Sequence, residues 1–196
     1  MQVETLTLTP YQSNCYLVGD GQRWVVIDPG AAEPSLTAAL AQRTLSAVVC
    51  THAHPDHVGG VPTLVERGTV PLYLHPAGYS LLQRFAPGVE AFVPLADEQV
   101  LTLGGLSFRV LHVPGHSPDQ VVLIAESERV IFVGDLVFAG SIGRTDFPLS
   151  DPQAMERSLR RLAGLPGDYT LYPGHGPTTT LERERQTNPF LVPLLV

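Results

Sequence analysis

Four apolar, strand-like segments end in the same way, and this repeated ending constrains the fold more than any other feature. Each segment runs into a turn that contains glycine or proline and presents a histidine or an aspartate there. The segments are AVVC at 47–50, FRVLHV at 108–113, VIFV at 130–133 and YTLY at 169–172. Functional sites in open α/β sheets form at the carboxyl ends of strands, so the four endings can converge on one edge.

The most crowded ending is THAHPDHVGG at 51–60, which places three histidines and one aspartate within six positions. Side chains two residues apart on extended backbone point the same way, so His52 and His54 can share one metal ion. Pro55 then turns the chain, and Asp56 and His57 can face a second position. The other endings add three more ligand-type side chains: His116, Asp135 and His175. Nitrogen and carboxylate ligands suit zinc, iron or manganese, and their spacing does not choose among these metals.

Strand and helix patterns alternate along the chain, which predicts a layered α/β fold. Strands are expected at 3–9, 14–18, 24–30, 47–50, 71–75 and 169–173, and as a run between 100 and 133. Helices are expected at 34–44, from Val58 to Val65, at 151–163 and after Thr179. Ser150 with Gln153, and Thr179 with Glu182, fit the caps of the last two helices. No linker separates these segments, so one domain over residues 1–196 is predicted.

Composition excludes several classes of partner. The chain has 196 residues, a net charge of −7 and no basic run, which argues against nucleic acid. No apolar stretch approaches the ~20 residues of a membrane span, and the first residues lack the pattern of a signal peptide. Only Cys15 and Cys50 are present, so no disulfide framework is indicated and both thiols are expected to be inert. A cytoplasmic protein without membrane contact is predicted.

The order of these motifs resembles that of a known superfamily. THAHPDH, PGH ending at His116, GD at Asp135 and PGH ending at His175 are similar to the metallo-β-lactamase superfamily. The strings NCYLV, VIDPG, GRTDFP, YPGHGPTTT and ERERQTNPF further resemble small glyoxalase II-like (hydroxyacylglutathione hydrolase-like) hydrolases. The resemblance covers nearly the whole chain. It implies an α/β fold of four layers, the αββα sandwich, with a site for two metal ions.

The resemblance also implies a role for each ligand. His52, His54 and His116 would hold the first divalent ion, Asp56, His57 and His175 would hold the second, and Asp135 would bridge them. Zinc is the favoured metal, with iron and manganese as alternatives. A water shared by two such ions is acidified and attacks a thioester or ester carbonyl. A thiolate leaves readily because the thiol pKa is only ~8.5, so no side-chain acid is predicted.

The expected substrate is a small-molecule thioester, with S-lactoylglutathione as one candidate. Glyoxalase II enzymes carry an added helical domain that helps bind glutathione, and the glutathione contacts of that domain are not carried over to the residues after His175. One alternative is a hydrolase of another ester or a lactone. A second is a persulfide dioxygenase with a single iron on His52, His116 and Asp135, because GRTDF resembles that group as well. A third is a non-catalytic module stabilised by metal. The oligomeric state, monomer or homodimer, stays open.

Five further polar residues allow two interpretations each. His75 and His112 are interpreted as structural, with a supporting role near the site open to His112. Asp28 could orient a ligand loop or merely shape a turn. Arg144 and Asp146 could touch substrate, but a structural ion pair is favoured.

Overall fold

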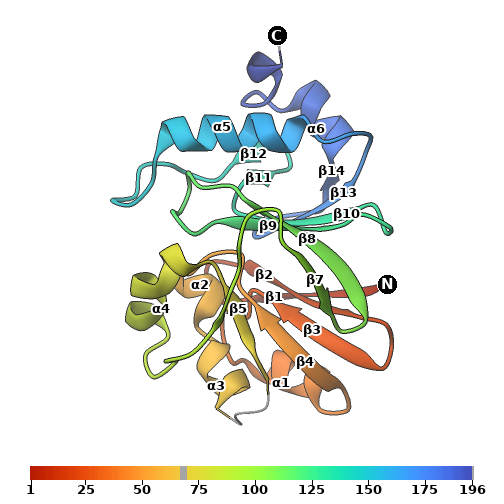
Figure 1. The fold of residues 1–196 in the computed structure, drawn as a ribbon, viewed down its shortest axis with the longest axis vertical. Helices are drawn as coiled ribbons and strands as arrows, with labels where there is room; N and C mark the ends of the chain where they lie inside the picture. Colours follow the sequence, from red (N-terminus) through yellow and green to blue (C-terminus); the bar gives the residue numbers. More distant parts are fainter. Residues whose placement is uncertain (67–69, 196) are drawn as a thin grey trace.

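Two six-stranded sheets pack face to face and carry helices on their outer sides (Figure 1). The computed structural model describes residues 1–66 and 70–195. Its four layers confirm the predicted αββα sandwich. The single domain predicted over 1–196 stays a prediction, and its residues 67–69 and 196 lie outside the described part.

The first sheet is built from the N-terminal half of the chain. Its strands are β1 (Gln2–Leu8), β2 (Ser13–Gly19), β3 (Arg23–Ile27), β4 (Thr44–Val49), β5 (Leu72–Leu74) and β6 (Val93–Pro94), in that spatial order. The first three strands run antiparallel, and β3 to β6 run parallel. Helices α1 (Pro34–Leu40), α2 (Pro55–Val58), α3 (Val61–Val65) and α4 (Tyr79–Phe85), with the 3-10 turn Pro76–Gly78, lie on this side of the molecule (Figure 1).

The second sheet comes from the C-terminal half. Its spatial order is β14 (Thr179–Thr180), β13 (Thr170–Pro173), β10 (Val130–Gly134), β9 (Val121–Ala125), β8 (Leu106–His112) and β7 (Val100–Leu103). Helices α5 (Pro152–Ala163) and α6 (Leu181–Thr187) cover its outer face (Figure 1). A small hairpin of β11 (Val137–Phe138) and β12 (Ser141–Ile142) precedes α5, and a 3-10 turn, Val192–Leu194, follows α6.

Apolar residues fill the space between the sheets and beneath the helices. Tyr16, Phe108 and Phe132 belong to one cluster in which both sheets meet. On the other side of the second sheet, α5 buries Met155, Leu159 and Leu162, as its spacing predicts. Each of these side chains contributes about 2 kcal/mol when it leaves water. Among the described residues, no helix is long and apolar enough to cross a bilayer.

The helix predicted from Val58 to Val65 is two short helices, α2 and α3, because Gly59 and Gly60 interrupt it. The Gly60 amide donates to the carbonyl of Pro29 at 2.8 Å. A Cβ on Gly59 would lie 2.4 Å from the carbonyl oxygen of Gly30. The chain therefore bends where the 29–31 loop passes against it. The helix predicted at 34–44 likewise ends early, at Leu40, because β4 begins at Thr44.

The cap of α5 differs from the prediction. Asp151, not Ser150, is the N-cap, and its carboxylate accepts hydrogen bonds from the amides of Gln153 and Ala154. An ionised carboxylate at this position also interacts favourably with the helix dipole. The Ser150 hydroxyl instead donates to the carbonyl of His116 at 2.7 Å. The residue that was expected to cap the helix therefore holds a ligand loop.

The cap of α6 is shifted by one residue. Thr180, not Thr179, accepts from the amide of Arg183, because β14 extends through Thr180. The Thr179 hydroxyl donates to Glu184 at 2.6 Å. Glu182 does not return to the cap as a capping box requires; its own amide donates to Asp168 instead.

Candidate metal centre

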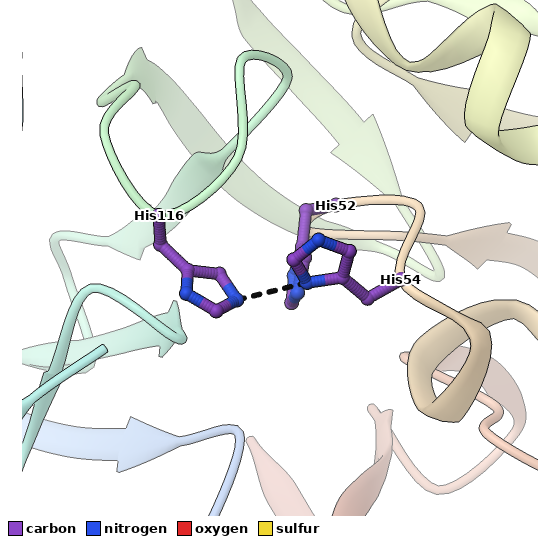
Figure 2. Close-up of side chains that lie close together, drawn as sticks. All are labelled: His52, His54 and His116. Carbon is purple, nitrogen blue, oxygen red and sulfur yellow. Dashed lines mark hydrogen bonds between the residues drawn. The ribbon is translucent and has the colours of Figure 1, made fainter. Parts of the chain in front are cut away.

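The four strand endings meet at one end of the sandwich. His52, His54, Asp56 and His57 follow β4 of the first sheet, whereas His116, Asp135 and His175 follow β8, β10 and β13 of the second. The rings of His52, His54 and His116 point toward one another across the gap between the sheets (Figure 2). All seven side chains predicted as ligands therefore lie in one cluster.

Three overlapping groups in this cluster are close enough together to hold a metal ion. Within each group the potential ligand atoms lie within 4.8 Å of one another. The groups are His52, His54 and His116; Asp56, His57 and His175; and His52, His57 and Asp135. The first two match the two ligand sets that the sequence predicts. The third group lies between them and connects them.

Asp135 occupies the middle of the cluster. Its Oδ1 lies 3.5 Å from Nε2 of His57. Its Oδ2 lies 3.4 Å from Nε2 of His116 and 3.6 Å from Nε2 of His175. One carboxylate thus faces histidines from both predicted sets, which is the arrangement that a bridging ligand needs.

Asp28 orients ligands on the buried side of the cluster. Of its two interpretations, a residue that orients a ligand loop or one that only shapes a turn, the contacts favour the first. Its Oδ2 lies 3.0 Å from Nδ1 of His57 and accepts the Thr51 hydroxyl at 2.7 Å. The Thr51 hydroxyl lies in turn 3.1 Å from Nδ1 of His52. Both histidines therefore use Nδ1 for a structural hydrogen bond and present Nε2 to the cluster. Histidines that bind metals are commonly oriented in this way.

Backbone carbonyls orient two more rings. Nδ1 of His116 donates to the carbonyl of Arg144 at 2.8 Å, and Nδ1 of His175 donates to the carbonyl of Tyr11 at 3.2 Å. Their Nε2 atoms are left facing Asp135. His54 differs, because its Nδ1 lies 2.9 Å from Nε2 of His116, as the dashed line in Figure 2 shows.

Three buried polar atoms of the cluster lack a hydrogen-bond partner among the described residues: Nε2 of His52, Nε2 of His57 and Oδ1 of Asp135. Buried polar atoms are normally paired, because desolvation without a partner costs about 1–3 kcal/mol each. Metal ions bound in the cluster would satisfy all three. The donors present, imidazole nitrogens and carboxylate oxygens, therefore fit zinc or another transition metal.

The electrostatics of the cluster also favour a cation. Burial alone would lower the pKa of His57, but Asp135 and Asp28 beside it raise that pKa to about 9. Burial alone would raise the pKa of Asp56, but a hydrogen bond from His175 and the nearby His57 lower it to about 2. The Asp56 carboxylate thus stays ionised and attracts positive charge, which a divalent ion would supply.

The histidines of the first set behave in the opposite way. Burial, followed by the neighbouring His116, lowers the pKa of His54 to about 4. Burial also lowers the pKa of His52 and of His116. Neutral imidazole is the form that binds a metal.

A cavity of about 710 Å³ opens over the cluster. Its apolar walls come from α4, the β11–β12 hairpin and the following loop: Leu81, Phe85, Phe138, Ile142, Phe147 and Leu149. The Phe147 ring stands with its centre 5.3 Å from that of His54. Arg84 and Arg144 also line the cavity, and its acidic residues within the described part of the chain are Asp56 and Asp135 of the cluster.

The remaining predicted residues lie around this centre. His75 and His112 stack at 3.9 Å with nearly parallel rings, and His112 donates to the carbonyl of Pro118, so both have structural contacts. Arg144 and Asp146 form the favoured ion pair, with two hydrogen bonds of 2.6 and 2.7 Å. Arg144 also lines the cavity.

Two features of the site escape the sequence prediction. Helix α4 supplies part of the cavity wall, and the spacing of Leu81, Leu82 and Phe85 is the helical signal that could have located it. Asp119 contacts the backbone between two ligands, at Ala53. Its position soon after PGH is a signal for it, but only the fold shows what it touches.

Comparison with known proteins agrees with this geometry. Residues 8–175 match the family model described as the metallo-beta-lactamase superfamily. The chain belongs to this superfamily. It is 34% identical to hydroxyacylglutathione hydrolase GloC of Haemophilus influenzae, over 97% of this chain and 98% of that protein.

Solved structures give the same result. The crystal structure of TTHA1623 in a di-iron-bound form superposes with a TM-score of 0.88 at 42% identity, covering 96% of this chain and 100% of that one. ETHE1 from Myxococcus xanthus superposes with a TM-score of 0.82 at 28% identity, covering 96% of this chain and 84% of that one. Fold, cluster and relatives are those of a metallo-hydrolase of this superfamily.

Proposed function

We propose that the chain is a metal-dependent hydrolase of acyl thioesters, with hydroxyacylglutathione thioesters such as S-lactoylglutathione as the first candidates. The observation that carries the proposal is the pair of ligand groups connected through Asp135 beneath one cavity. The identity with GloC over nearly the full length of both chains supports the choice of substrate.

We propose that one divalent ion is held by His52, His54 and His116. The second is held by Asp56, His57 and His175, and Asp135 is a ligand to both. Zinc suits these donors, and the di-iron form of TTHA1623 supports iron as the alternative. Two adjacent ions, when bound, acidify a shared water for attack and polarise the carbonyl oxygen of the substrate.

The protein's own residues position the reactants. Asp28 and Thr51 hold the rings of His57 and His52 in place, so these ligands do not reorganise during the reaction. The Phe147 ring and its apolar neighbours line the cavity over the cluster and offer an apolar surface to the substrate. Because a thiolate is a good leaving group, no side chain is assigned as a general acid.

The charge of the cavity favours an anionic substrate. Arg84 is exposed there, lies over the Phe85 ring at 5.1 Å, and has no carboxylate partner among the described residues. Arg144, the other arginine of the cavity, is paired with Asp146, so Arg84 is the cation that this wall offers, in a chain whose net charge is −7. A thioester whose thiol part bears a carboxylate fits this distribution.

A second candidate is a persulfide dioxygenase with one iron on His52, His116 and Asp135. The GRTDF string and the structural likeness to ETHE1 support it. The second ligand group argues for the hydrolase, because a one-iron site leaves Asp56, His57 and His175 without a role.

One experiment separates the two candidates. Protein purified without chelator is analysed for metals and assayed with S-lactoylglutathione in air and under anaerobic conditions. We expect close to two transition-metal ions per chain and the same rate of hydrolysis in both atmospheres. Oxygen uptake with glutathione persulfide, together with one iron per chain and no thioesterase activity, would establish the dioxygenase instead.

A further inference from the structure

Asp119 is a fully buried carboxylate directly behind the proposed metal centre. Its Oδ2 accepts a hydrogen bond of 2.8 Å from the backbone amide of Ala53. Ala53 stands between His52 and His54, so this bond holds the backbone from which both rings project. The same oxygen packs closely on Gly78, where an added Cβ would lie only 2.2 Å from it.

The other oxygen of Asp119 holds a different ligand loop. Its Oδ1 accepts the hydroxyl of Ser117, the residue that follows His116. The Ser117 side chain is fully buried as well. One carboxylate therefore connects the loop after β4, in the first sheet, with the loop after β8, in the second.

Burial of the Asp119 carboxyl costs free energy of desolvation, which its hydrogen bonds must offset. No salt bridge to Asp119 occurs among the described residues, and burial raises the pKa of its carboxyl. A buried carboxyl is tolerated when its oxygens are used as acceptors, and both oxygens of Asp119 are. Its two bonds go to segments that carry His52, His54 and His116, which is one complete ligand group.

We propose that Asp119 is a positioning residue that sets the spacing between His54 and His116 and thereby the affinity for the first metal ion. The two rings lie 2.9 Å apart at their facing nitrogens although they come from different sheets (Figure 2). Asp119 accepts from the Ala53 amide and the Ser117 hydroxyl and so connects the two segments, alongside the hydrogen bond from the Val121 amide to the Thr51 carbonyl. The inference rests on the proposed metal centre and not on the reaction.

The test uses Co²⁺ as the probe. Metal-free protein is titrated with Co²⁺, and the visible absorption band and competition with a chelator report affinity at each site. Asp119→Ala should weaken the first site about 10–100-fold, the usual effect of removing a partner that supports a ligand, and alter its band. The second site, formed by Asp56, His57 and His175, should keep its affinity.

The conservative variant should rescue binding. In Asp119→Asn the amide oxygen can still accept from Ala53, and the amide nitrogen can donate to the Ser117 hydroxyl. We expect Co²⁺ affinity within about threefold of wild type. Asp168→Ala is the matched control: Asp168 likewise accepts two hydrogen bonds, from the amides of Tyr169 and Glu182, but outside the ligand loops. It should leave Co²⁺ binding unchanged even if the protein melts earlier.

Each outcome bears on the inference. Wild-type Co²⁺ affinity and spectrum in a folded Asp119→Ala protein would overturn it. If Asp119→Ala does not fold, Ser117→Ala decides: weaker first-site binding supports the inference, and unchanged binding overturns it. Failure of the wild-type protein to bind Co²⁺ would overturn the metal centre as well, which distinguishes the two claims.

Discussion

At the scale of single residues, Asp56 is the carboxylate that belongs to the second ligand group alone. Its Oδ2 lies 3.2 Å from Nε2 of His175 and 3.7 Å from Nε2 of His57. Asp56→Ala should lower the metal content from about two ions to about one, because the first group is untouched. Thioesterase activity should fall at least ~10²-fold, the scale on which a preorganised electrostatic element acts.

Metal analysis and steady-state kinetics on the same preparation check this prediction. Asp20→Ala is a suitable control, since Asp20 accepts the amides of Gln22 and Arg23 in a turn outside the ligand loops. Wild-type turnover in Asp56→Ala would show that the second ion is dispensable and would favour the one-iron alternative.

Arg84 is the residue from which substrate selectivity is expected. Arg84→Gln removes a cation from the cavity wall, so thioesters with a carboxylate on the thiol part should bind more weakly. An exposed ion pair contributes about 1 kcal/mol, which corresponds to about a fivefold rise in KM with little change in kcat. A thioester of the uncharged thiol N-acetylcysteamine should show no such rise. Arg157→Gln, at an exposed position of α5, is the matched control. Equal effects on both substrates would contradict the prediction.

At the scale of elements, the His116 loop is fitted against the start of α5. Gly115 has a φ of +149°, and a Cβ there would lie 2.4 Å from Cα of Met155. The Gly115 carbonyl also accepts the amide of Asp151, the N-cap of α5, at 2.8 Å. Helix and ligand loop are thus held in close contact by a position that only glycine fits.

Gly115→Ala should therefore lower the free energy of unfolding by about 1–3 kcal/mol and weaken metal binding, because His116 must move with its backbone. Chemical denaturation and Co²⁺ titration measure the two effects. Gly164→Ala, at the other end of the same helix, is the control: its backbone is helical and the nearest atom to an added Cβ lies 3.3 Å away. Wild-type stability and Co²⁺ affinity in Gly115→Ala would contradict the prediction and show that the loop and α5 can separate at little cost.

At the scale of the whole molecule, the metal ions would connect the two halves of the sandwich. The ligands after β4 belong to the first sheet, and those after β8, β10 and β13 belong to the second. Ions that bind only the folded chain stabilise it by about 2.7 kcal/mol when free metal exceeds Kd a hundredfold. For a chain of this length that corresponds to roughly 5–10 °C in Tm.

Removal of metal with a chelator should lower Tm by that amount, and added Zn²⁺ should restore it. Differential scanning calorimetry of the protein before dialysis, after dialysis and after reconstitution measures the change. An unchanged Tm in protein shown to be free of metal would mean that the cluster does not link the sheets energetically.

The sequence by itself determined which residues stand at the strand ends and what chemistry they carry. Buried strands appear as continuous apolar runs, and the turns that follow them are marked by glycine and proline, so both are local signals. The apolar spacing of α5 was also sufficient, because a twelve-residue amphipathic helix repeats its pattern several times. These signals located the seven predicted ligands before any contact was known.

Only the tertiary structure decided how those residues meet. His54 and His116 are 62 positions apart, and their contact depends on how the two sheets pack. No local pattern distinguishes Asp119 from other loop aspartates, because its hydrogen bond with the Ala53 amide joins residues 66 positions apart. Arg84 became part of the cavity because α4 packs beside the cluster. Contacts between distant segments arise from the packing of whole layers, and no local pattern records which side chains that packing brings together.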